Sequence, residues 1–150
     1  MHRVLNRWVV IIGLIICISC SGDDDNNQPV VNQQQAQIET NVQSGTWRIT
    51  KFIDSGNDEL HHFAGFTFKF FSNDVVTATK GSTIYTGSWS ITDSSLSDDS
   101  PNDLDFNIEF ITPADFQDLN DDWDFISQSS TKIELIDISG GGSGTDLLTF

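Results

Sequence analysis

Apolar and polar residues alternate along most of the chain from residue 45 to residue 150. The run 66–70 has phenylalanine at every second position, and 104–110 places Leu, Phe, Ile and Phe in the same way, with polar residues between them. Strict alternation is typical of antiparallel strands with one face buried and the other in water. The sequence therefore predicts an all-β domain over 45–150.

Turn-forming residues divide this pattern into eight short strands. Ser72–Asp74 and Gly81–Ser82 are examples of the polar and glycine-containing breaks that mark hairpins. One short helix is expected over 113–119, with Thr112 as its N-cap and Asp115 in a capping box. The expected strands are 47–53, 65–71, 75–80, 83–91, 103–110, 122–128, 131–138 and 145–150.

Many short strands joined by hairpins predict a small eight-stranded up-and-down antiparallel barrel, because closure removes exposed sheet edges. In the first strand, Trp47, Ile49 and Ile53 are expected to share the buried face. A two-sheet β-sandwich is the alternative, since periodicity alone does not distinguish the two.

The first 19 residues have the pattern of a secretory signal. Arg3 and Arg7 precede an 11-residue stretch, 8–18, that is apolar except for one glycine. A membrane-spanning helix needs about 20 apolar residues, so this stretch is better explained as the apolar part of a signal peptide. The sequence predicts a signal peptide over 1–19, removed before Cys20.

The segment Cys17-Ile18-Ser19-Cys20 resembles a bacterial lipobox, although Leu is more usual at the position of Cys17 and Gly or Ala at that of Ser19. The resemblance implies that Cys20 is lipidated and anchors the chain in a membrane. An acidic segment after the cysteine resembles the export signal of Bacteroidetes lipoproteins that are sent to the outer surface of the outer membrane. The expected location is therefore the outer membrane, exposed at the cell surface, with the periplasmic face as the alternative. That segment consists of Ser21, Gly22, Asp23, Asp24 and Asp25.

Residues 20–44 combine the cysteine with a polar stretch rich in Asp, Asn, Gln and Ser. Such a composition offers too little apolar surface to offset the entropy of ordering. We expect a flexible tether, in which Ile38 and Val42 are spaced to form one helical turn against the domain.

Three segments of the domain resemble lipocalin-like barrels found in Bacteroidetes lipoproteins. Gly45-Thr46-Trp47 is similar to the Gly-x-Trp opening of lipocalins, and 87–91 and 145–150 are similar to later strands of small lipocalin-like domains. The resemblance covers most of 45–150. It implies a barrel that can hold a small apolar ligand.

Large inward-facing side chains decide whether such a barrel has a cavity. An eight-stranded barrel either fills with side chains or holds one small ligand. The aromatic set can line a pocket or fill the core, so two functions stay open: an apolar-ligand carrier, or a filled acidic barrel that acts as a surface protein-interaction module through loops 54–64, 92–102 and 139–145. The candidate ligand-lining or core residues are Trp47, Phe66, Phe68, Phe70, Trp89, Phe106, Phe110 and Trp123.

Net charge narrows the range of partners. The chain carries −15, and removing residues 1–19 takes away two arginines and no acid, which leaves −17. A field of this sign repels nucleic acid and anionic lipid head groups but attracts cations and basic partners. Both cysteines lie at or before the lipidation site, so the mature chain is expected to have no free thiol or disulfide.

Other candidate sites have weak support in the sequence. Asp118, Asn120, Asp122 and Asp124 have the spacing of the first half of a calcium-binding EF-hand loop, but the later glycine and glutamate of that loop are missing. His61 and His62 are expected in a loop, where adjacent side chains of an extended chain point apart. Since no nucleophile or phosphate-loop motif is present either, the sequence predicts no enzyme, no cofactor and no metal.

Overall fold

A computed structural model describes residues 30–93, 104–138 and 144–150, and the statements below concern these residues. The predicted signal peptide, Cys20 and the segment Ser21–Asp25 lie outside them. Two α-helices, one 3-10 helix (η1) and nine strands make up the fold. In chain order they are α1 (Val30–Gln43), β1 (Lys51–Asp54), β2 (Asn57–Asp58), η1 (Leu60–Phe63), β3 (Thr67–Phe70), β4 (Val75–Lys80), β5 (Thr83–Asp93), β6 (Leu104–Glu109), α2 (Ala114–Gln117), β7 (Asp121–Gln128), β8 (Ile133–Asp137) and β9 (Asp146–Thr149).

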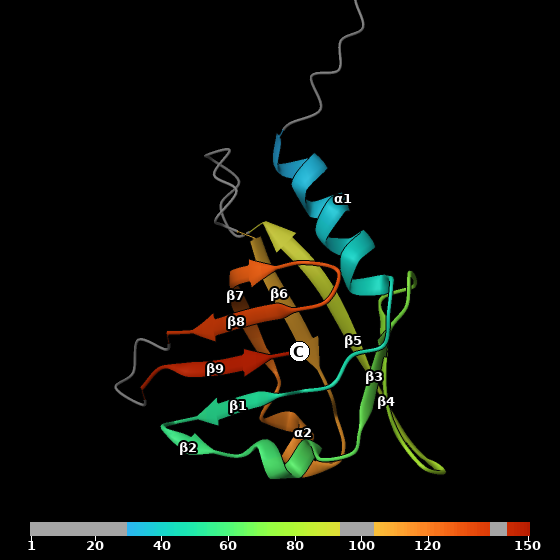
Figure 1. The fold of residues 1–150 in the computed structure, drawn as a ribbon, viewed down its shortest axis with the longest axis vertical. Coiled ribbons are helices and arrows are strands. Elements are labelled where there is room, and N and C mark those ends of the chain that lie inside the picture. The colour runs from blue at the N-terminus through green and yellow to red at the C-terminus, as the bar shows by residue number, and fades with distance from the viewer. Residues whose placement is uncertain (1–29, 94–103, 139–143) are drawn as a thin grey trace, which may run out of the picture.

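All nine strands belong to one antiparallel sheet, so the structure is not the two-sheet sandwich considered as the alternative. The order is β2-β1-β9-β8-β7-β6-β5-β4-β3, in which each strand from β3 to β9 pairs with the next. The sheet curls so that β8, β9 and β1 run at a steep angle to β5 and β6 (Figure 1). The closed eight-stranded barrel is not confirmed. In the described residues, the end strand β3 meets the chain ahead of β1 through the isolated pair Trp47 and Phe68.

The eight expected strands are all present, and the ninth is the two-residue strand β2. Ser55 and Gly56 connect β1 to β2 with positive φ angles of 49° and 82°. Two consecutive residues with positive φ form the kind of tight turn whose twist matches a β-hairpin. This segment falls in the expected loop 54–64, because a serine in the first turn position is a weak hairpin signal.

The prediction that Ile53 shares a face with Trp47 and Ile49 is wrong. Trp47 and Ile49 are buried, but Thr50 and Lys51 are both exposed, and it is Phe52 that is buried at 1% exposure. Two consecutive exposed residues reverse the alternation. The reversal falls where the chain stops pairing with β3 and starts pairing with β9.

Helix α1 occupies most of the segment expected to be a flexible tether, so that prediction is wrong for residues 30–43. Ile38 and Val42 are buried at 1% and 0% exposure, and they anchor the helix over one end of the curled sheet (Figure 1). The Gln35 side chain donates to the carbonyl oxygen of Ile91 at 3.0 Å. Two buried apolar side chains and a few hydrogen bonds to distant parts of the same chain therefore order a helix whose composition is otherwise polar.

Helix α2 confirms the expected short helix in a shorter form, although its capping differs. Pro113 occupies the N-cap position with no side-chain cap, rather than Thr112. The carboxylate of Asp115 lies against His62 from η1. Both η1 and α2 lie at the end of the sheet opposite α1 (Figure 1).

Candidate functional site

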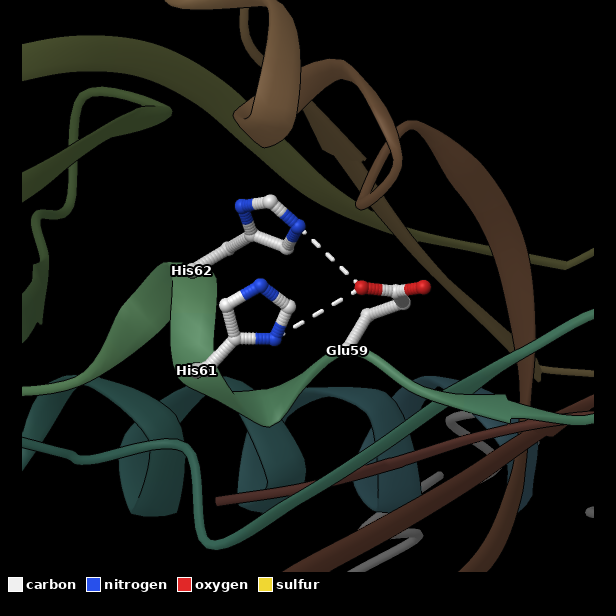
Figure 2. A group of neighbouring side chains, drawn as sticks. All are labelled: Glu59, His61 and His62. Atoms are coloured by element: carbon white, nitrogen blue, oxygen red, sulfur yellow. Dashed lines mark hydrogen bonds and ion pairs between the residues drawn. The ribbon is translucent and has the colours of Figure 1, made fainter.

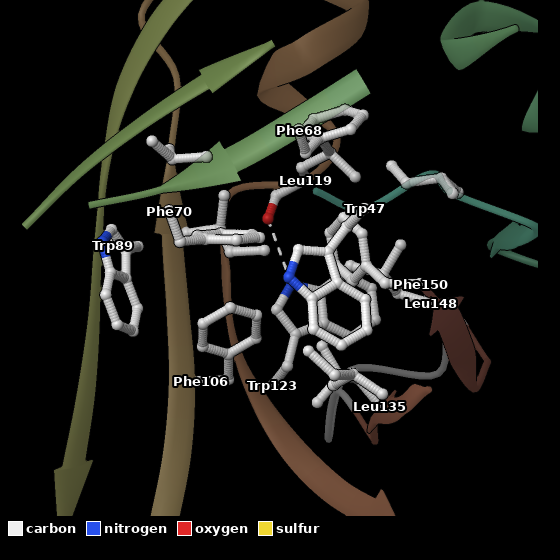
Figure 3. Packing of buried hydrophobic residues seen from close by; sticks show 14 of the residues in the cluster. Trp47, Phe68, Phe70, Trp89, Phe106, Leu119, Trp123, Leu135, Leu148 and Phe150 are labelled. Carbon is white, nitrogen blue, oxygen red and sulfur yellow. Dashed lines mark hydrogen bonds between the residues drawn. The ribbon is translucent and has the colours of Figure 1, made fainter. Parts of the chain in front are cut away.

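The eight aromatic residues predicted as ligand-lining or core are all buried. Their exposed fractions lie between 0% and 9%, and they belong to one apolar cluster. Phe70 illustrates the packing, because its ring lies 5.4–5.7 Å from those of Trp89, Phe106 and Phe150 (Figure 3). Side chains that contact one another at such distances fill the space that an interior ligand would need.

The buried tryptophans have their polar atoms satisfied within the fold. The indole N–H of Trp47 donates to the carbonyl oxygen of Val42 at 2.8 Å, and that of Trp123 to Leu119 at 3.1 Å (Figure 3). Trp89 donates likewise to Phe71 at 2.9 Å. These indoles are structural, since none of them presents a free donor to an interior ligand.

Phe116 lies at the centre of a ring cluster that the sequence did not single out. It packs between rings from η1, β3, β5 and the end of β6, with centroid separations of 5.0–6.0 Å. In the sequence it falls within the short helix expected over 113–119, and nothing in the pattern marks it as central. Its central position depends on the curl of the sheet, which brings distant strands around α2.

Glu59, His61 and His62 converge at η1 (Figure 2), where the His61 side chain is largely exposed. The Glu59 carboxylate oxygen Oε2 lies 3.1 Å from His62 Nε2 and 3.6 Å from His61 Nδ1. The prediction that the two histidines point apart is wrong because residues 60–63 form a 3-10 helix rather than an extended loop. The imidazole rings lie with their centroids 4.0 Å apart.

Asp115 joins this cluster from α2. Its Oδ2 lies 3.0 Å from Nδ1 of His62, so both ring nitrogens of His62 face carboxylates. Burial alone lowers the pKa of His62, but the hydrogen bonds and charges of Asp115 and Glu59 outweigh it and raise the pKa above its usual value. Burial and the charge of Asp54 raise the pKa of the neighbouring Asp118. The cluster is therefore a concentration of negative charge around two imidazoles.

The residues with an EF-hand-like spacing have other partners or positions in the structure. The amide of Asn120 accepts the N–H of Phe110 at 2.6 Å and donates to the Phe110 carbonyl oxygen at 2.9 Å. Asp122 and Asp124 lie in β7 on either side of the buried Trp123. The oxygen of Asn120 that calcium would require is thus already engaged in connecting β6 to β7.

A polar groove of about 520 Å³ crosses the outer face of β5, β6 and β7. Ser88, Ser90 and Asn107 line it, together with the carboxylates of Asp74, Glu109 and Asp121. Burial, the hydrogen-bonded carboxyl of Asp122 and the charge of Asp137 raise the pKa of Asp121 to about 6.

A second groove, of about 720 Å³, has the opposite charge. Arg48 and Lys132 line it with Thr46, Thr50 and Thr131. Lys132 pairs with Glu134 beside this groove. The charged side chains that line the groove over β5–β7 are all acidic, so this groove is the one suited to a basic partner.

None of the helices in the described residues is long and apolar enough to cross a membrane. No protein-family model matches the chain, and no curated protein matches it. A solved structure of a DUF4847 family protein from Bacteroides vulgatus is similar, with a TM-score of 0.43 and 17% identity over 72% of this chain and 92% of that chain. This degree of similarity supports no inference about function.

Proposed function

We propose that this chain is a lipid-anchored, extracytoplasmic domain that acts through its outer surface as a protein-interaction module. The observation that carries the proposal is the filled interior, where the eight candidate rings are buried in one apolar cluster and Phe70 packs against Trp89 and Phe106. A carrier for a small apolar molecule needs an interior cavity of about 300 Å³ or more. In this proposal, the resemblance to lipocalin-like domains extends to the curled shape of the sheet and not to the carrying of a ligand.

Anchoring is proposed through Cys20, on the strength of the lipobox and the acidic segment that follows it. We propose the outer face of the outer membrane as the location. Incorporation of labelled fatty acid into the wild-type chain, and none into Cys20→Ala, is the expected result. Digestion of the chain by protease added to intact cells distinguishes the outer face from the periplasmic face.

The surface function is assigned to the acidic groove over β5–β7, whose partner is a basic protein. The carboxylates of Asp74, Glu109 and Asp121 line this groove, and the chain as a whole is strongly acidic. Opposite charges raise association rates and make binding sensitive to salt. Cross-linking on cells at low and high salt is expected to capture one partner with the wild-type chain at low salt.

Two variants make this test specific. Glu109→Gln removes an exposed groove charge and is expected to reduce capture, whereas Asp124→Asn removes an exposed charge outside the groove and serves as the control. Equal capture by both variants excludes the groove. Mass spectrometry of an extract of the denatured wild-type chain tests the carrier function, and a stoichiometric apolar molecule would refute the filled-core proposal.

A further inference from the structure

We propose that Glu59, His61 and His62 bind a divalent transition-metal ion such as Zn²⁺, and that Asp115 positions His62 for this role. One carboxylate oxygen and one nitrogen from each histidine all lie within 4.8 Å of one another (Figure 2). This site lies at η1 and shares no lining residue with the acidic groove, and its existence does not depend on the protein-interaction function.

The two separations between the Glu59 oxygen and the histidine nitrogens are close to those around a tetrahedral ion. Bonds of 2.0–2.2 Å to nitrogen and oxygen place neighbouring ligand atoms roughly 3.3–3.6 Å apart. The Glu59 oxygen lies 3.1 Å from His62 Nε2 and 3.6 Å from His61 Nδ1. Binding therefore requires side-chain adjustments of a few tenths of an ångström at these two separations and a modest rotation between the histidines.

The local backbone explains why neighbouring residues are able to chelate. Side chains three positions apart eclipse in a 3-10 helix, which places Glu59 beside His62. The turn is fixed from beneath by Phe63, which is 2% exposed and packs on Phe52 and Phe116 with ring centroids 5.1 Å and 5.2 Å away. The ligands thus stand on an anchored element, which reduces the entropy lost on binding.

Asp115 provides the observation that most favours a metal over a simple polar cluster. With Nε2 of His62 directed to the ion, Nδ1–H donates to the Asp115 carboxylate, 3.0 Å away. Metal-binding histidines nearly always donate their second N–H to a carboxylate, carbonyl or water, which fixes the tautomer and raises ligand basicity. Asp115 comes from a separate element, α2, so this contact is produced by the tertiary fold.

The ligand set determines the class of ion. Two imidazoles and one carboxylate suit Zn²⁺, Ni²⁺ or Cu²⁺, whereas Ca²⁺ and Mg²⁺ prefer sites made only of oxygen. Three protein ligands leave a fourth position on a tetrahedral ion. The His61 side chain is 70% exposed, so the site faces water, which can fill that position.

Titration calorimetry with ZnCl₂ alone tests the proposal on the full chain, purified in detergent without a polyhistidine tag and stripped with a chelator. One Zn²⁺ per chain is expected. His61→Ala is expected to weaken binding at least tenfold, and thermal melting is expected to show that it folds, because His61 is exposed. Asp115→Asn is expected to weaken binding about 10–100-fold while keeping one ion per chain.

Asp124→Asn, which removes an exposed acid elsewhere, is the charge control and is expected to bind Zn²⁺ like the wild type. Substitution with Co²⁺ adds a spectroscopic measurement, since tetrahedral coordination gives visible absorption bands that His61→Ala should lose. Unchanged Zn²⁺ affinity in His61→Ala, absence of Zn²⁺ binding by the wild type, or binding of Ca²⁺ in preference to Zn²⁺ would each overturn the proposal. In those cases the cluster is an ion-pair network that holds η1 against α2.

Discussion

Replacing Phe116 with alanine tests whether the interior is filled. Phe116 is 1% exposed, and its ring contacts five others, from Phe63, Phe66, Phe68, Tyr85 and Phe110, at centroid separations of 5.0–6.0 Å. Those neighbours come from different elements around α2. Because they are held by the sheet and by η1, they are unable to collapse fully into the space that the substitution leaves.

The expected loss in the free energy of unfolding is about 3–5 kcal/mol, the usual cost of truncating a buried phenylalanine. The free energy of unfolding of a domain of this size is roughly 5–15 kcal/mol, so the variant is expected to fold and its stability to remain measurable. The loss combines the transfer of the ring to water with the cavity that remains. Removing a ring that lined an open ligand pocket would lower the free energy of unfolding much less, because water or the pocket walls would already occupy the space.

Urea unfolding followed by tryptophan fluorescence measures this difference. Phe71→Ala is the control, since Phe71 is 40% exposed and its removal is expected to cost about 1 kcal/mol or less. The slope of free energy against urea should be the same for all three proteins. Benzene is expected to restabilise only Phe116→Ala, because a dry apolar cavity binds it. A loss no larger than that of Phe71→Ala would refute the filled core.

Three further substitutions test single contacts. Burial and the carboxyl of Asp122 raise the pKa of Asp121 from 3.8 to about 6, so its ionisation reduces stability as the pH rises through that interval. The free energy of unfolding of Asp121→Asn is therefore expected to exceed that of the wild type by on the order of 1 kcal/mol at pH 8 and to equal it at pH 4. A difference that is the same at the two pH values would contradict this. Gly87→Ala is expected to cost about 1–3 kcal/mol in urea unfolding, because its Cβ would lie 2.3 Å from a backbone oxygen at the end of β6. Gly45→Ala, which meets nothing within 4 Å, is the control, and equal stability of the two variants would exclude the clash. Ile38→Asp is expected to detach α1 and increase hydrogen exchange in residues 30–43, and unchanged protection there would show that the helix does not depend on this contact.

Most of the strands can be predicted from the alternation of apolar and polar residues, because a buried strand face requires apolar residues at every second position. It locates the strands around Phe68, Trp89 and Phe106 within a residue or two. It fails at Phe52, where a change of pairing partner reverses the alternation. It also misses α1, since a polar helix with two apolar anchors is ordered by the surface on which it docks rather than by its own composition.

The metal-binding cluster lies beyond sequence reasoning for a different reason. A pair of adjacent histidines chelates poorly in an extended chain and well on a 3-10 turn, and no strong local signal in Glu59–Phe63 distinguishes the two. The contact between His62 and Asp115 joins η1 to α2. It forms only because the aromatic cluster around Phe116 holds those elements together, so this site is a consequence of packing.

For a chain anchored through Cys20 as proposed, the positions of the helices bear on which way the cluster faces relative to the membrane. Cys20, the proposed anchor, precedes the start of α1 by ten residues, a length of chain that reaches at most about 35 Å. Helix α1 covers one end of the curled sheet, and η1 and α2 lie at the opposite end (Figure 1). A short connection at the α1 end favours orientations in which that end lies nearer the lipid. The Glu59–His61–His62 cluster would then face the medium, where an ion with an open coordination position can be reached by a partner that supplies the fourth ligand.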